Sequence, residues 1–261
     1  MYPTLPFGPL SLPTTPLLAL IAFWLALEVT ARSGRRFQLD SDDVWNIGLV
    51  ALLAALLVAR LWNVFQFREI YLEQPQLILS LRPSGFVWPP GIAAGLIVAY
   101  IFLLRNAMDP VRVLAAFGLG GLAAAAVFGV SHYLTGAVVG TPTQLPWATW
   151  YYGAQVHPVG LYRTVGFLVV LVAVWWTIDG QQPWRTIWQT GFGYSVVRLI
   201  TDGFVGDPAL VGQFRASQLA ALLGALVCAF LLAQGVGHQP STPPEQRDDL
   251  VPGSVDAPTG A

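Results

Sequence analysis

Long apolar runs separated by short polar turns extend along the chain to about residue 236. A helix that crosses a bilayer needs about 20 mostly apolar residues. Seven segments reach or approach that length, at about 14–31, 44–66, 90–105, 112–133, 158–178, 186–204 and 215–234. Backbone groups in lipid must be hydrogen bonded within their own segment, so these runs predict helices. They lack the shorter alternating strands typical of a membrane barrel.

The pattern divides the chain into two regions. Residues 1–236 are predicted to form an all-α, polytopic membrane domain of about seven helices, with an outer loop region near 134–156. Residues 237–261 are rich in Pro, Asp and Glu without an apolar period, which predicts a disordered tail. The first apolar stretch has neither a basic segment before it nor a small-residue cleavage site after it. We therefore interpret it as a retained helix rather than a removed signal peptide.

Composition supports a membrane protein. The chain has 261 residues, of which 55% are hydrophobic and only 10% are charged, whereas soluble domains carry about 25% charged residues. The net charge of −1 indicates no nucleic-acid partner. Cys228 is the single cysteine, which excludes an internal disulfide and a cysteine-based metal site. No glycine-rich phosphate loop occurs, and the sequence predicts neither a metal nor a cofactor.

Arginines predict the orientation in the membrane. They occur in three turns that alternate so as to share one side: Arg32, Arg35 and Arg36, then Arg105 and Arg112, then Arg185. Positive residues mark cytoplasmic loops, so we expect the N-terminus outside and the C-terminus in the cytoplasm. The opposite loop 134–156 has no charged residue and is rich in Trp and Tyr. Such rings suit the headgroup interface, and the alternative is a small cap over a site.

Arg198 and Asp202 are the clearest candidates for chemistry. They lie four residues apart in an apolar run, with Tyr194 four residues before Arg198, so all three share one helical face. Charged residues at membrane depth mark a substrate site, an ion path or a fixed partner. The alternative is that Arg198 and Asp202 only neutralise each other between packed helices.

Other polar side chains fall near the same outer boundary. His132 and His157 flank the loop 134–156, and each is a candidate general base or a structural hydrogen-bonding residue. Arg60 and Arg163 are candidates for extending to the interface along the helix surface. Two arginines near an outer headgroup would also make a phosphate clamp.

Several short motifs occur in order along the chain: Phe7-Gly8-Pro9-Leu10-Ser11-Leu12, Ala59-Arg60-Leu61, His157-Pro158-x-x-Leu161-Tyr162, Tyr194-x-x-x-Arg198-x-x-x-Asp202, and Gln218 at the start of the last helix. Through them the chain resembles the prolipoprotein diacylglyceryl transferase family over most of residues 8–235. The family patterns at the last four are Gly-Gly/Ala-Arg, His-Pro-x-Gln-Leu-Tyr-Glu, Tyr-Gly-x-x-Arg-x-x-x-Glu and Met-Gly-Gln.

The resemblance implies seven helices with the N-terminus outside, in a multi-pass protein of the bacterial plasma membrane. It also implies an activity. Family members move the diacylglyceryl group of phosphatidylglycerol to the thiol of a lipobox cysteine in a secreted preprotein, which gives a thioether and releases glycerol phosphate. The implied partners are phosphatidylglycerol and prolipoprotein signal peptides.

If the chain is a divergent transferase of this family, its polar residues would have the following roles. Arg198 with Arg60 would hold the headgroup phosphate, and His132 or His157 would take the thiol proton. Asp202 would orient Arg198. The remaining substrate contacts would come from Tyr162, Tyr194 and Gln218.

Several positions depart from the family patterns. A family His reads Pro89, a family Arg reads Gly129, a family Asn reads His132 and a family Glu reads Ala137. The Glu of the Tyr-Gly motif is shortened to Asp202, and the Arg that follows it reads Val205. Three hypotheses follow. The chain is a divergent transferase of the family type, a catalytically inactive relative that binds anionic phospholipid or a lipoprotein partner, or a transferase with a different acceptor that the aromatic loop reads.

Overall fold

The computed structural model describes residues 4–7, 10–79, 85–151 and 153–235. Within these residues, seven helices have 18 residues or more: α1 (Thr14–Gly34), α2 (Ser41–Gln66), α4 (Trp88–Arg105), α5 (Pro110–Thr135), α6 (Val159–Trp176), α7 (Pro183–Thr201) and α8 (Ala216–Ala233). The shorter helical elements are η1 (Arg35–Phe37), α3 (Arg68–Glu73), η2 (Pro75–Leu79) and η4 (Asp202–Phe204).

Three antiparallel hairpins lie outside the helices. They pair β1 (Thr4–Phe7) with β2 (Leu10–Pro13), β3 (Thr149–Tyr151) with β4 (Ala154–Val156), and β5 (Leu210–Val211) with β6 (Phe214–Arg215). The sequence pattern did not predict these strands, because each is only two to four residues long and none carries a sustained alternation.

The predicted helical membrane fold is confirmed. Of the helices in the described residues, six are long and apolar enough to cross a membrane. The exception among the long helices is α7, which contains Arg185 and Arg198 together with three Thr residues and one Gln. The number of crossings and the orientation therefore stay predictions. The predicted tail 237–261 and the Gly8-Pro9 pair of the opening motif lie outside the described residues.

Local sequence accounts for several helix boundaries. The side chain of Asp40 accepts a hydrogen bond from the amide of Asp42 and caps α2, and Asp109 caps α5 in the same way through the amide of Val111. The α5 helix ends at Gly136, whose φ of 69° is the left-handed conformation that glycine adopts without strain. These signals place the start and the end of the helix that carries His132.

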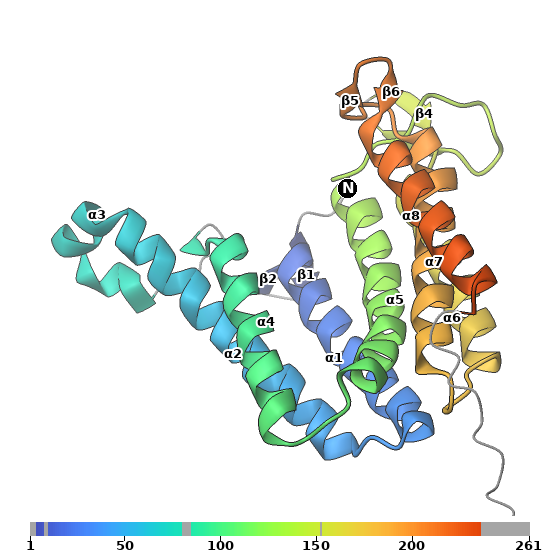
Figure 1. Ribbon diagram of the computed structural model, residues 1–261. Coiled ribbons are helices and arrows are strands. Elements are labelled where there is room, and N and C mark those ends of the chain that lie inside the picture. The colour runs from blue at the N-terminus through green and yellow to red at the C-terminus, as the bar shows by residue number, and fades with distance from the viewer. Residues whose placement is uncertain (1–3, 8–9, 80–84, 152, 236–261) are drawn as a thin grey trace, which may run out of the picture.

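The α5 helix is central and packs against α1, α6 and α7, while α8 packs on α7 (Figure 1). The α2 and α4 helices form a separate pair that leans away from α5 in Figure 1. Gly91 allows this pair to approach closely, because a Cβ there would lie 2.5 Å from the carbonyl oxygen of Ala55. Small residues at helix contacts are typical of packing in lipid, where no hydrophobic force drives helices together.

One end of the bundle collects the loops that matter for the site. There α5 ends, α6 begins, α7 ends and α8 begins, with β4, β5 and β6 beside them (Figure 1). His132, His157, Asp202 and Gln218 all lie within four residues of one of these helix ends. The fold therefore brings polar residues from four helices to one depth.

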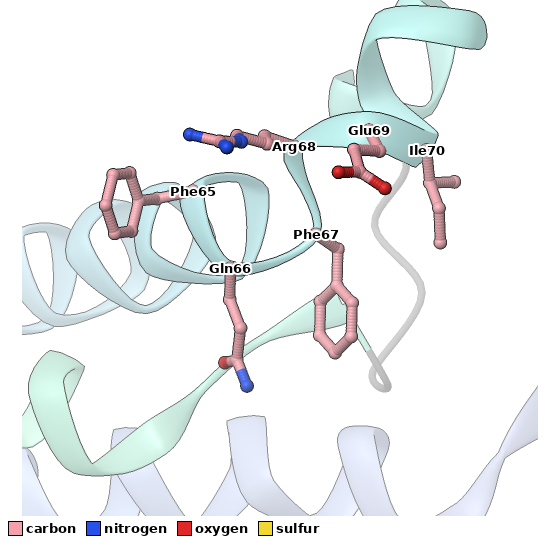
Figure 2. Close-up of a pocket in the computed structure, with 6 residues that line it drawn as sticks. All are labelled: Phe65, Gln66, Phe67, Arg68, Glu69 and Ile70. Carbon is pink, nitrogen blue, oxygen red and sulfur yellow. The ribbon is translucent and has the colours of Figure 1, made fainter.

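A separate pocket of about 480 Å³ lies where α2 bends into α3, lined by residues 65–70. Figure 2 shows Gln66 and Phe67 on the same side of this bend, with Arg68 projecting away from them. Phe65, Phe67 and Ile70 are all exposed here, as expected for residues that contact the membrane interface.

Candidate functional site

Asp202 lies between two arginines. Its Oδ1 accepts a hydrogen bond of 2.6 Å from Nη2 of Arg163, and its Oδ2 accepts bonds of 2.8 and 3.1 Å from Nη2 and Nε of Arg198. Arg198 reaches it from one helical turn earlier, as the four-residue spacing predicts. Arg163 comes from α6. Both oxygens of the carboxylate are therefore occupied by charge-assisted hydrogen bonds.

The cluster carries excess positive charge. Asp202 is fully buried and Arg163 is only 5% exposed, whereas the side chain of Arg198 keeps 30% of its surface exposed. One negative charge faces two positive charges, so a formal net charge of +1 remains in the cluster. Because Arg198 is the more accessible arginine, it is the group that an incoming anion can contact. The expectation that Arg163 extends to the interface is wrong, since this side chain is buried on Asp202.

A third arginine supports the same turn. Nη1 of Arg215 donates to the carbonyl oxygens of Asp202, Gly203 and Val205 at 2.8–3.0 Å. Carbonyl groups at a helix C-terminus have no partner within the helix and carry partial negative charge. Arg215 satisfies these groups and fixes the η4 turn that holds Asp202. Gln218 contributes similarly, because its Nε2 donates to the carbonyl oxygen of Leu199 at 3.0 Å.

A pocket of about 280 Å³ opens beside Arg198, between α7 and α8. Its lining residues are Tyr194, Ser195, Arg198, Ser217, Ala220 and Ala221. The ring of Tyr194 stacks on Phe167 with centroids 5.1 Å apart, which fixes one wall. The pocket thus combines a partly exposed cation with hydroxyl groups and small apolar side chains.

Two histidines lie near this cluster in different settings. His132 is half-buried in the last turn of α5, close enough to Arg163 and Arg198 to interact with their charges. His157 packs on Phe204 with ring centroids 4.8 Å apart, and its Nδ1 lies 3.2 Å from the hydroxyl oxygen of Tyr162. The two histidines therefore approach the cluster from different sides of the loop 134–156.

The side chains of Trp147, Tyr162 and His157 form a chain of hydrogen bonds. Nε1 of Trp147 donates to the hydroxyl oxygen of Tyr162 at 2.8 Å. In the described part of the chain, the other partner of that hydroxyl is Nδ1 of His157 at 3.2 Å, and a phenol that accepts from Trp147 can donate its proton to that nitrogen. In that arrangement a neutral His157 carries its own proton on Nε2, which is then a hydrogen-bond donor.

The aromatic loop is attached to the turn that holds Asp202. The amide of Thr141 donates to the carbonyl oxygen of Phe204 at 2.8 Å. The amide of Gly206 donates to the carbonyl oxygen of Val139 at 2.9 Å. His157 closes the arrangement through its own amide, which donates to the carbonyl oxygen of Thr141 at 3.1 Å. These contacts support the cap alternative. Trp147 and Trp150 remain exposed on the loop.

Arg60 does not take part in the cluster around Asp202. Its guanidinium donates to the carbonyl oxygens of Leu77, Ile78 and Gly85 and lies over the rings of Tyr71 and Phe86. Arg60 belongs to α2, which packs on α1 and α4, whereas Arg198 belongs to α7. Its contacts fix the α3–η2 segment against α2.

Gly129 explains one departure from the family pattern. A Cβ at this position would lie 2.4 Å from Oγ1 of Thr164 and 2.7 Å from the carbonyl oxygen of Gly160. No side chain fits there without moving α6. The second arginine of this cluster comes from α6, at Arg163, where the family motif has Glu after Tyr.

The fold and the cluster define a class of protein. It is a helical membrane protein with an arginine–carboxylate cluster and a small polar pocket at one end of its bundle. A family model for prolipoprotein diacylglyceryl transferase matches residues 4–234. The chain belongs to the prolipoprotein diacylglyceryl transferase family.

Individual relatives have low sequence identity to this chain but match most of its length. A phosphatidylglycerol–prolipoprotein diacylglyceryl transferase of Clostridioides difficile is 24% identical over 203 residues, which cover 77% of this chain and 82% of the relative. One of the same name from Synechococcus elongatus is 25% identical over 236 residues, covering 83% of this chain and 81% of the relative. The match therefore includes all of the helices that form the cluster.

Proposed function

We propose that this protein transfers the diacylglyceryl group of phosphatidylglycerol to the thiol of a lipobox cysteine. The observation that carries the proposal is the buried Asp202 with arginines on both oxygens, one of which opens into a pocket. Family membership and the names of the relatives support the same reaction. The bacterial plasma membrane is the location that this reaction implies.

In the proposed reaction, the cysteine sulfur attacks the glycerol carbon that is bonded to the phosphate oxygen. A carbon–sulfur bond forms, the carbon–oxygen bond breaks, and the electron pair stays on the oxygen of glycerol phosphate. Arg198 contacts the phosphate as its negative charge increases, and Arg163 adds positive charge behind it. Fixed donors directed at developing charge are the usual source of such stabilisation.

The thiol proton needs an acceptor, because the thiolate is the nucleophile. We assign this role to His132, which lies in the last turn of α5, at the end of the bundle where α7 ends beside Asp202. We assign His157 a donor role, with Tyr162 donating to its Nδ1 and its own proton on Nε2. Its Nε2 proton is available for donation to a phosphate or glycerol oxygen instead.

Specific observations favour two alternative functions. An inactive relative that binds anionic phospholipid is favoured by the loss of the family His at Pro89 and the family Arg at Gly129. A transferase with a different acceptor is favoured by the uncharged aromatic loop, whose Trp147 and Trp150 are exposed. Both alternatives retain the phosphate site at Arg198.

Complementation tests the proposal. Cells depleted of their own transferase would express this chain together with a lipoprotein that has a lipobox. We expect a mass increase equal to one diacylglyceryl group on the lipobox cysteine, lost on Arg198→Ala. Unmodified preprotein beside folded, membrane-inserted wild-type protein would favour the inactive relative. Modification of another molecule would favour the changed acceptor.

A further inference from the structure

Two serines line the pocket beside Arg198. Ser195 is only 9% exposed and lines the pocket from α7, and Ser217 lines it from the first turn of α8. Neither side chain makes a hydrogen bond within the described residues. A hydroxyl without a protein partner is free to hydrogen bond a ligand in the pocket.

The helix contact leaves space for the Ser195 hydroxyl. Gly224 on α8 faces it, and a Cβ at position 224 would lie 2.7 Å from Oγ of Ser195. Alanine or a larger residue at 224 would force that hydroxyl to move. The hydroxyl and the glycine therefore form one complementary contact beside the pocket, with Arg198 three residues further along α7.

The same two positions depart from the family patterns quoted above. Those patterns have Gly after Tyr and Gly before Gln, whereas this chain has Ser195 after Tyr194 and Ser217 before Gln218. Both changes add a hydroxyl, and both hydroxyls lie on the pocket that Arg198 lines. The two serines therefore add hydrogen-bonding groups to the same pocket.

A serine hydroxyl both donates and accepts, which complements an alcohol. Arg198 supplies the contact for a phosphate oxygen. A phosphodiester whose outer substituent carries hydroxyl groups would satisfy all three residues at once. We propose that Ser195 and Ser217 are specificity-determining residues that recognise the hydroxyl groups of a polyol headgroup held at Arg198. This inference rests on the phosphate site of the proposed function.

Lipid binding to the purified protein tests the inference without requiring turnover. The two ligands are phosphatidylglycerol and phosphatidylpropanol, which matches it but lacks both headgroup hydroxyls. Binding would be measured by native mass spectrometry. One hydrogen bond is worth about 1 kcal/mol, or roughly a five-fold preference. We expect wild type to prefer phosphatidylglycerol and each of Ser195→Ala and Ser217→Ala to lose about five-fold of that preference.

The control is Ser33→Ala, which removes a buried helical hydroxyl far along the chain from the pocket. In the Ser195→Ala/Ser217→Ala protein, affinity for phosphatidylpropanol should stay at the wild-type value. An unchanged preference in that double variant would overturn the inference, and so would equal binding of both lipids by wild type. If instead Arg198→Ala binds phosphatidylpropanol as tightly as wild type does, the phosphate site of the proposed function fails.

Discussion

Arg163 and Asp202 are 39 residues apart in the chain and are joined by a 2.6 Å hydrogen bond between almost fully buried side chains. The bond connects the start of α6 to the end of α7. Because Arg198 holds the other oxygen of the same carboxylate, the phosphate-binding arginine is fixed through Asp202 to a second helix. The geometry of the proposed site therefore depends on a residue that does not line the pocket.

Removal of the carboxylate should be costly. Asp202→Asn leaves two arginines without their counter-charge, and breaking a buried ion pair from one side costs roughly 3–5 kcal/mol. We expect a loss of that size in the free energy of unfolding, measured by denaturant titration in mixed micelles. Asp207→Asn is the control, since Asp207 is exposed. Equal effects of the two substitutions would contradict a structural role for the cluster.

Trp147 should control the tautomer of His157. Loss of the indole N–H in Trp147→Phe frees the Tyr162 hydroxyl to accept from His157, which lets the proton redistribute to Nδ1. The chain has only three histidines, so ¹⁵N spectra of histidine-labelled protein can assign each ring. Wild type should show the Nε2–H form at His157, with a larger Nδ1–H population in the variant.

Tyr162→Phe is the companion variant for this prediction. It removes the hydroxyl itself and should give a redistribution like that in Trp147→Phe, while His132 keeps its wild-type signals. An Nδ1–H form already present at His157 in wild type would show that Tyr162 does not donate to it.

Gly129 should not tolerate a side chain. Gly129→Ala places a methyl group against the α6 backbone, and overpacking of this kind costs about 1–3 kcal/mol. Gly121→Ala in the same helix is a matched control, because no atom lies within 4 Å of its added Cβ. That control should be neutral or gain about 0.5–1 kcal/mol from helix propensity. Unfolding in mixed micelles would compare the two, and equal stabilities would show that α5 and α6 pack less closely than described.

Arg60 should stabilise the α3–η2 segment rather than bind lipid. Arg60→Met removes its bonds to three carbonyl groups, so amide hydrogen exchange should become faster across residues 70–79. Arg68→Met, at an exposed neighbouring arginine, should leave this exchange unchanged. Phosphatidylglycerol binding should be unaffected in both variants. A selective loss of lipid affinity in Arg60→Met would instead support its predicted place in the substrate site.

Sequence spacing was sufficient for the local part of the site. The four-residue interval predicts that Arg198 and Asp202 share a helical face, and they do pair. Apolar run lengths likewise located the long helices to within a few residues. Both inferences depend only on the order of residues within one helix, which is visible in the sequence.

The long-range contacts were not predictable in the same way. From the sequence alone, Arg163 is predicted to extend along the helix surface to the interface. Its pairing with Asp202 depends on the packing of α6 beside α7. Arg215 gives no signal by itself, because its partners are backbone carbonyl groups. Trp147 lies in an aromatic loop whose hydrogen bond to Tyr162 depends on how that loop folds back.

The proposed transfer is tested most directly with purified protein in phosphatidylglycerol nanodiscs and a lipobox peptide. Mass spectrometry would follow the cysteine thiol for wild type, Arg198→Ala and Ser33→Ala. We expect a thioether-linked diacylglyceryl group with wild type and Ser33→Ala, and none with folded Arg198→Ala. An unmodified peptide with folded wild-type protein, or full modification by Arg198→Ala, would contradict it.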